Sequence, residues 1–104
     1  MSPSRLETLS RMLESRPDDP RLRFGLAMEY LTQERLDEGV AELRRYLALA
    51  DDEGNAWGRL GAALRTQGKD EEAQEAYRSG IEAAQRHGHP TMVEEFEEIL
   101  DDWE

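Results

Sequence analysis

Two histidines, His87 and His89, stand one residue apart and are the most obvious candidates for chemistry in this sequence. Imidazole nitrogens bind zinc, but a zinc site needs three or four ligands, and no third ligand is evident near this pair. The sequence contains no cysteine, which excludes disulfides, thiolate catalysis and cysteine-ligated zinc. We therefore expect no metal site and no cofactor.

The 24 Asp and Glu residues are the other source of chemistry, because two carboxylates can act as general acid and general base. Such a pair needs a dry pocket that separates its two pKa values, and nothing in the pattern predicts one. No glycine-rich phosphate loop is present either: Gly54 falls in an expected turn, and Gly58 and Gly61 at expected packing positions. The sequence therefore predicts a protein that is not an enzyme.

The formal net charge of -11 is spread along the chain. Nucleic acids and anionic membranes are therefore not expected as partners, because both are bound through Lys and Arg. No apolar run approaches the length of a membrane span, and the first residues do not resemble a signal peptide. We expect a cytoplasmic protein.

Six segments carry apolar residues at helical spacing, and strand signals are absent. Ser4 with Glu7 has the form of a capping box, as has Thr91 with Glu94. Asp19 can cap the helix that begins at the following proline. The expected helices cover about residues 4–15, 20–33, 36–49, 55–67, 70–86 and 90–104. Short helices with tight turns predict an all-α antiparallel array, and 104 residues favour a single domain, 1–104.

An internal repeat of 34 residues relates the second and third segments to the fourth and fifth. Small residues meet small ones and large residues meet large ones, as helix–helix packing requires. The matched pairs are Leu26 with Leu60, Ala27 with Gly61, Gly39 with Ala73, and Leu43 with Tyr77.

With this period the chain resembles the tetratricopeptide repeat (TPR) family, in the form of a small bacterial-type TPR domain protein. The pattern of the second copy is Trp57-x₂-Leu60-Gly61-x₂-Leu64…Ala73-x₃-Tyr77, with Gln85 where the family has proline. The first copy is looser and reads Arg23-x₂-Leu26-Ala27-x₂-Tyr30…Gly39-x₃-Leu43.

The resemblance implies an antiparallel α-α superhelix with two full repeats, 20–53 and 54–87. The helix at 4–15 then looks like the second half of a preceding repeat. The helix at 90–104 looks like a capping helix, because Glu94 and Glu95 break the repeat pattern. Members of this family commonly bind other proteins, which implies a non-catalytic adaptor or scaffold.

A binding groove is also implied, because the first helices of TPR repeats line a concave surface. In the second segment, Leu26 and Ala27 share one face, which suffices to pack against the following helix. A second apolar face is left over, and we expect it to form the groove floor. Three arginines ring this floor, which predicts an acidic or C-terminal carboxylate on the bound peptide. The predicted groove residues are Arg21, Phe24, Met28, Leu31, Asn55, Arg59, Ala62 and Arg65.

Two alternatives to this groove stay open. The second apolar face can be buried by the first segment, and the arginines can pair with Glu29 or other nearby acids. Chaperone-tail recognition is not expected, because Phe24, Met28 and Arg59 stand where family members with that activity use a Lys and Asn clamp.

The last segment is a second candidate surface, since it has an apolar stripe on an otherwise acidic helix. The stripe can cover the open end of the array, as terminal repeats require. Alternatively, it can exchange with a second copy and make a homodimer. The stripe consists of Met92, Phe96, Ile99, Leu100 and Trp103.

Overall fold

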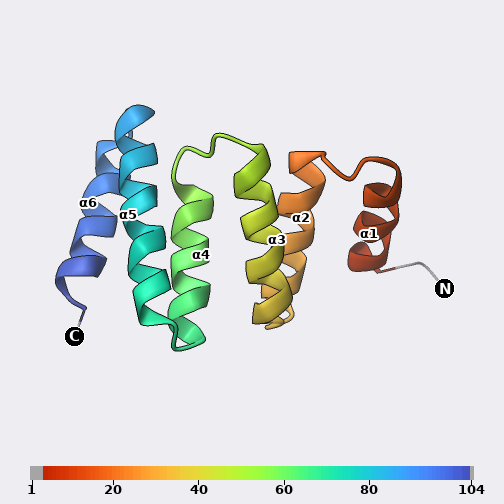
Figure 1. The fold of residues 1–104 in the computed structure, drawn as a ribbon, viewed down its shortest axis with the longest axis horizontal. Coiled ribbons are helices and arrows are strands. Elements are labelled where there is room, and N and C mark those ends of the chain that lie inside the picture. The colour runs from red at the N-terminus through yellow and green to blue at the C-terminus, as the bar shows by residue number, and fades with distance from the viewer. Residues whose placement is uncertain (1–3, 104) are drawn as a thin grey trace. The chain divides into compact units, whose positions relative to one another are not determined.

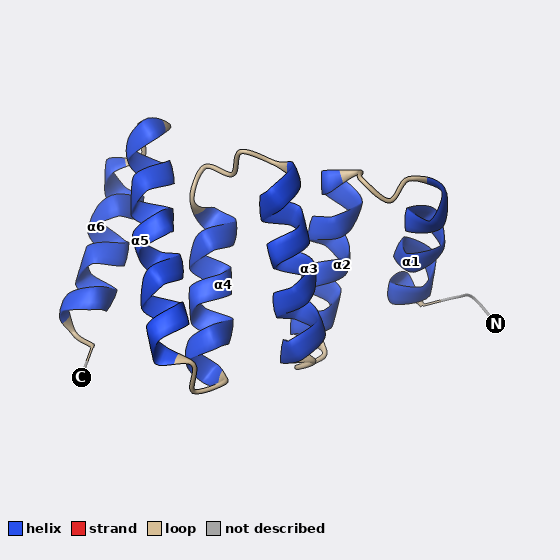
Figure 2. Cartoon of the chain, in the orientation of Figure 1, coloured by secondary structure: helices blue, strands red, loops and turns tan. Residues whose placement is uncertain are grey.

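The computed structural model describes residues 4–103, and this range holds six α-helices and no strand (Figures 1 and 2). They are α1 (Arg5–Ser15), α2 (Pro20–Thr32), α3 (Leu36–Leu49), α4 (Asn55–Thr66), α5 (Asp70–Arg86) and α6 (Pro90–Asp101). The all-α fold class is confirmed, with two helical pairs flanked by one helix at each end. None of these helices is long and apolar enough to cross a bilayer.

The contacts divide the chain into two compact units, Met1–Ala50 with α1, α2 and α3, and Asp51–Glu104 with α4, α5 and α6. Within each unit, successive helices run antiparallel (Figure 1). The repeat pairs are α2 with α3 and α4 with α5, and each belongs to one unit. That residues 1–104 act as a single domain stays a prediction.

Two of the predicted helix starts are capped as expected. The Glu7 amide donates to Oγ of Ser4 over 3.1 Å. The Arg21 amide donates to Oδ1 of Asp19 over 3.0 Å, and Pro20 occupies the first turn of α2. The prediction for Thr91 was wrong, because α6 begins one residue earlier and has His89 at its N-cap position, without a side-chain cap. Proline at the first position fixes a helical φ without losing a hydrogen bond.

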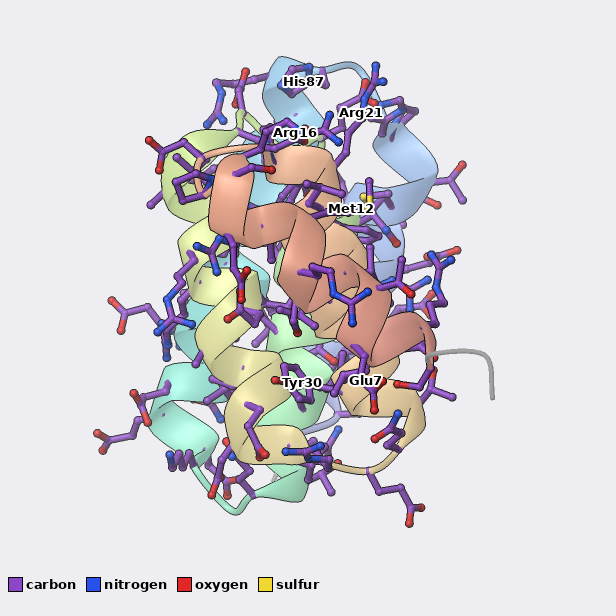
Figure 3. All side chains as sticks on the ribbon, turned by 90° about the vertical axis from the view of Figure 1, so that its right-hand side faces the viewer. Glu7, Met12, Arg16, Arg21, Tyr30 and His87 are labelled. Carbon is purple, nitrogen blue, oxygen red and sulfur yellow. The ribbon has the colours of Figure 1, made fainter. Side chains whose placement is uncertain are left out.

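One core cluster of the first unit lies between α1 and α2. Leu9 and Leu13 of α1 pack against Leu22 and Leu26 of α2, and Leu6 and Tyr30 pack at the edge of this cluster. Met12 stays exposed on α1 (Figure 3). The amphipathic first helix therefore covers one side of the α2–α3 pair, as expected for half of a repeat.

Matched positions of the two repeats are buried alike. Leu26 is 5% exposed and Leu60 is 1% exposed. Gly39 and Ala73 are both buried as well. The 34-residue period therefore corresponds to repeated packing, which is the condition on which the repeat interpretation depends.

Candidate peptide-binding surface

The apolar face of α2 that we predicted to line a groove faces α3 at two of its three positions. The ring of Phe24 lies 5.1 Å from the ring of Tyr46, centroid to centroid. Leu31 packs on Gly39, where an added Cβ would lie 2.6 Å from Cδ2 of Leu31. These two half-buried side chains contact α3, so part of the predicted groove floor serves to pack α2 against α3.

The assignment of the two faces of α2 was wrong for Leu26. We expected it to pack against α3, but it belongs to the cluster with α1, as does Tyr30. Ala27 does face α3, since a Cβ added at Gly39 would lie 3.6 Å from the Ala27 carbonyl oxygen. Because α2 lies between two neighbouring helices, it needs two apolar faces. The alternative that the first segment buries the second face was wrong, because Phe24 and Leu31 of that face contact α3.

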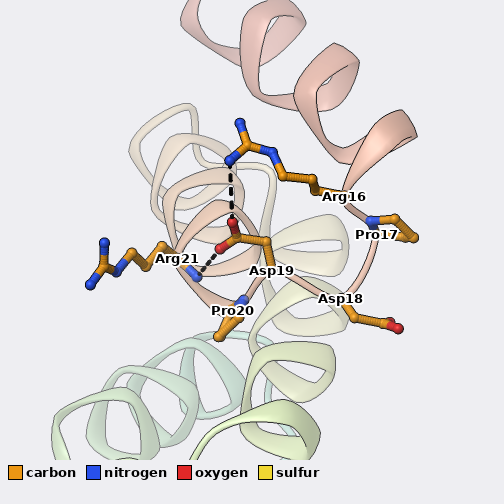
Figure 4. A pocket seen from close by; sticks show the side chains of 6 residues that line it. All are labelled: Arg16, Pro17, Asp18, Asp19, Pro20 and Arg21. Atoms are coloured by element: carbon orange, nitrogen blue, oxygen red, sulfur yellow. Dashed lines mark hydrogen bonds and ion pairs between the residues drawn. The ribbon is translucent and has the colours of Figure 1, made fainter.

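Two predicted residues of α2 remain accessible. Met28 is half-buried, and Arg21 is exposed at the start of the helix. The Arg21 side chain points away from Asp19, whereas Arg16 reaches the Asp19 carboxylate at 3.8 Å (Figures 3 and 4). Within residues 4–103 no carboxylate pairs with the Arg21 guanidinium. Glu29, which was considered as its partner, pairs instead with Arg5 at 3.3 Å.

A shallow depression surrounds this turn and is lined by Arg16, Pro17, Asp18, Asp19, Pro20 and Arg21 (Figure 4). The Asp19 carboxylate already accepts the amide hydrogen of Arg21. The depression is therefore a helix-capping turn, and we assign it no ligand.

The equivalent face of α4 is more open. Asn55, Arg59 and Ala62 are exposed. No carboxylate in the described part of the chain pairs with Arg59. These three residues form what we call the α4 surface.

Arg65, the last predicted residue of α4, is engaged by α6 of its own unit. Its guanidinium carbon lies 4.0 Å from the ring centroid of Trp103, a cation–π contact. Burial raises the pKa of the neighbouring Tyr77 phenol, and the charge of Arg65 opposes that shift. The Arg65 guanidinium therefore contacts Trp103 and is not left unoccupied for a ligand.

The apolar stripe of α6 packs onto α4 and α5. Phe96 is 8% exposed, and its ring centroid lies 5.5 Å from that of Tyr77. An added Cβ on Gly54 would lie 2.6 Å from Sδ of Met92. The remaining stripe residues are half-buried, namely Ile99, Leu100 and Trp103. This packing is that of a capping helix, and dimerisation through the stripe would require it to leave its own unit.

Sequence reasoning assigned no role to His87 and His89, and the structure pairs both with carboxylates one repeat earlier. Nε2 of His87 lies 3.0 Å from Oδ2 of Asp51, and Nε2 of His89 lies 3.0 Å from Oε1 of Glu53. A hydrogen bond from Arg86, together with the contact to His87, holds the pKa of the Asp51 carboxyl below its ordinary value of 3.8. No cluster of three or more metal-ligating residues capable of holding an ion occurs among residues 4–103.

A second feature missed in the sequence is the buried carboxylate of Glu42. It accepts from Nη1 of Arg23 at 3.0 Å and pairs also with Arg45. The 34-residue register contains the signal, because Arg23 stands where the second repeat has Trp57. A charge at an apolar repeat position indicates a buried ionic partner.

Comparison with known proteins agrees with this architecture. A tetratricopeptide repeat family model matches residues 54–87, the range predicted for the second repeat. A peroxisomal targeting signal receptor from Eremothecium gossypii is 32% identical over 78 residues, which cover 74% of this chain. The match spans only 14% of the length of that receptor.

A solution structure of a protein from Bordetella parapertussis is similar over nearly the whole chain. It is 33% identical, with a TM-score of 0.79, and the match covers 96% of this chain and 87% of that one. Fold and comparisons together define a helical repeat protein that provides surfaces for protein–protein interaction. The chain belongs to the tetratricopeptide repeat family.

Proposed function

We propose that this chain is a non-catalytic module that binds a peptide segment of a partner protein through the α4 surface. The observation that carries the proposal is that Asn55, Arg59 and Ala62 are all exposed on one face of α4, with no carboxylate partner for Arg59 among the described residues of a chain with 24 acids. Six other arginines are paired with carboxylates: Arg5, Arg16, Arg23, Arg35, Arg45 and Arg86.

The chemistry of the α4 surface fits an extended acidic segment. The guanidinium of Arg59 presents parallel N–H donors that match a carboxylate, including a C-terminal one. The amide of Asn55 can donate to and accept from a peptide backbone. Ala62 leaves space beside them. The name of the Eremothecium gossypii relative, a receptor for a targeting signal, supports a peptide ligand as well.

On α2, Arg21 and Met28 are the predicted residues that stay available to a ligand. They belong to the first unit and are not part of the α4 surface, which lies in the second unit. Phe24 and Leu31 are left out, because they are engaged by α3.

Affinity purification from the native host tests the proposal. Asn55→Ala with Arg59→Ala should abolish capture of the partner that the wild type retains. Arg78→Ala is the matched control, since Arg78 is an exposed arginine of α5, also without a carboxylate partner in the described chain, and lies outside the α4 surface. Equal capture by wild type and double variant would rule out the α4 surface.

The alternative proposal is a structural module that dimerises through α6, which requires α6 to leave its own unit. Light scattering on the wild type decides it, and a monomer at every concentration would remove it. A cytoplasmic location also stays a proposal, and fractionation of the host cells tests it.

A further inference from the structure

The two repeats differ in how they fill one space between their two helices. The second repeat has no side chain of its own to fill it. In the first repeat, the contacting rings of Phe24 and Tyr46 fill the space between α2 and α3. In the second repeat, 34 residues later, the same two positions are Gly58 and Gly80. Two glycines leave a hollow between α4 and α5 where the first repeat has two aromatic rings.

This hollow is filled by a side chain from outside the helical pair, Phe96 of α6. An added Cβ would lie 2.7 Å from Cζ of Phe96 at Gly58 and 2.8 Å from Cε2 at Gly80. The ring of Tyr77 closes one side in an edge contact. We call this hollow the Gly58–Gly80 socket. Its walls accept a phenyl ring with little room to spare.

The helix that fills the socket is attached more weakly than the helices that build it. Phe96 is the one residue of α6 that is buried, whereas α4 has five buried residues and α5 has six. The start of α6 is linked to the rest of its unit by an exposed pair, His89 with Glu53, and by a hydrogen bond from the His89 amide to the Ala84 carbonyl oxygen over 2.8 Å, after the turn at Gly88. Elements with few buried contacts open at the lowest free energy.

We propose that α6 is an internal ligand of the Gly58–Gly80 socket, and that the partner is an acidic helix with an aromatic side chain which displaces it. The inference rests on the proposed function and specifies the ligand. What α6 and the residues after it offer defines the chemistry. The helix has an aromatic anchor and five carboxylates with no basic residue, and Trp103, which follows it, adds a second ring against Arg65. No carboxylate of α6 pairs with Arg59 or Arg65 in the described chain, and the exposed Arg59 guanidinium stays available to the carboxylates of a partner helix.

A labelled synthetic peptide with the sequence of residues 89–103 tests this in the full-length chain, by fluorescence anisotropy. The wild type should bind it weakly, because its own α6 competes. Phe96→Ala should bind at least about tenfold more tightly, since an unoccupied socket removes that competition. Adding Gly58→Phe, which copies Phe24 of the first repeat, should abolish the gain. A peptide with alanine at the position of Phe96 should not bind.

Equal binding by the wild type and Phe96→Ala would overturn the proposal, and so would binding unaffected by Gly58→Phe. If Phe96→Ala does not fold, hydrogen exchange on the wild type decides. The amides of α6 should exchange at least about tenfold faster than those of α5, and equal protection counts against a displaceable α6. A wild-type dimer that exchanges α6 would assign the socket to a second copy and also refute the partner proposal.

The native partner separates the two proposals. Capture lost in the Asn55→Ala and Arg59→Ala variant but retained in Gly58→Phe would refute the socket and leave the peptide-binding function standing. Capture retained in the Asn55→Ala and Arg59→Ala variant but lost in Gly58→Phe would refute the α4 surface and leave the socket standing.

Discussion

The α2–α3 pair and the α4–α5 pair share one register but fill it with different side chains. Between α4 and α5 the contact is Gly61 against Tyr77, where an added Cβ would lie 2.7 Å from the ring. Between α2 and α3 the same positions hold Ala27 and Leu43, both 0% exposed. A larger residue on one helix is matched by a smaller one on the other, so the two pairs preserve total volume.

At a neighbouring place the two pairs differ in chemistry as well. The first uses the ion pair of Arg23 with Glu42, and the second has Trp57 and Ala76. Both arrangements fill the position, but only the ionic one must keep both partners. The comparison shows that the shared register specifies which positions contact each other. The residue types at those positions, apolar or ionic, differ between the two repeats.

Breaking the ion pair should have the largest effect. Glu42→Ala leaves the Arg23 guanidinium, 19% exposed, without its carboxylate, and should cost about 2 kcal/mol of unfolding free energy. Copying the second repeat with Arg23→Trp and Glu42→Ala together should restore stability to within about 1 kcal/mol of the wild type. Urea denaturation measures both values. A double variant as unstable as Glu42→Ala would mean that the two repeats are not interchangeable here.

The contact of Gly61 with Tyr77 should be sensitive to one methyl group. Gly61→Ala adds helix propensity but forces the tyrosine ring aside, for a net loss of about 1 kcal/mol. In a double-mutant cycle with Tyr77→Leu, which recreates the Ala27–Leu43 combination, the two changes should couple by about 1 kcal/mol. Additive effects would show that volume is not conserved between these positions.

The fold was readable from the sequence because it depends on local signals that agree with one another. The small residues Gly39 and Ala73 fall in phase, and Ser4 and Asp19 cap where expected. Periodicity also identified the apolar faces of α2. It did not say which neighbour each face contacts, because an angle around a helix carries no information about the helices beside it.

The candidate site was predicted less well than the fold for the same reason. Leu31 and Phe24 have the composition of a groove floor, but their partners Gly39 and Tyr46 lie on another helix. The pairing of His87 with Asp51 was hidden too, since the two residues are 36 positions apart. In a repeat protein, residues about one period apart lie side by side, and that rule would have found the pair.

Helix ends provide a smaller test of the comparison. Gly68 ends its repeat helix with a φ of 78°, and the equivalent residue of the first repeat is Glu34, with a φ of 59°. A side chain is strained in this left-handed region. Glu34→Gly should therefore stabilise the chain by about 0.5 kcal/mol, and Gly68→Ala should destabilise it by about 1 kcal/mol. Thermal melts of both variants measure this, and a destabilised Glu34→Gly would contradict it.

The smallest effect should be one of pH, at the repeat position of Asp51, the last turn of the first repeat. Asp51 pairs with Arg86 and His87, whereas the equivalent positions one period earlier and one period later are Pro17 and Gln85, which do not titrate. Because its folded pKa is depressed, Asp51 contributes stability above the ordinary value of 3.8 and loses it as the pH falls through the folded pKa. Asp51→Asn should therefore lower the melting temperature at neutral pH.

This difference between wild type and Asp51→Asn should shrink as melts are repeated below pH 3.8 and vanish once the carboxyl is protonated in the folded state. Asp18→Asn is the matched control: Asp18 is an exposed carboxylate of the first unit with no ion pair in the described chain, so its variant should show no such convergence. A difference for Asp51→Asn that persists unchanged at the lowest pH would mean that the side chain acts through its shape. In that case the ion pairs of Asp51 with Arg86 and His87 would not stabilise the contact between the turn before α4 and the turn before α6.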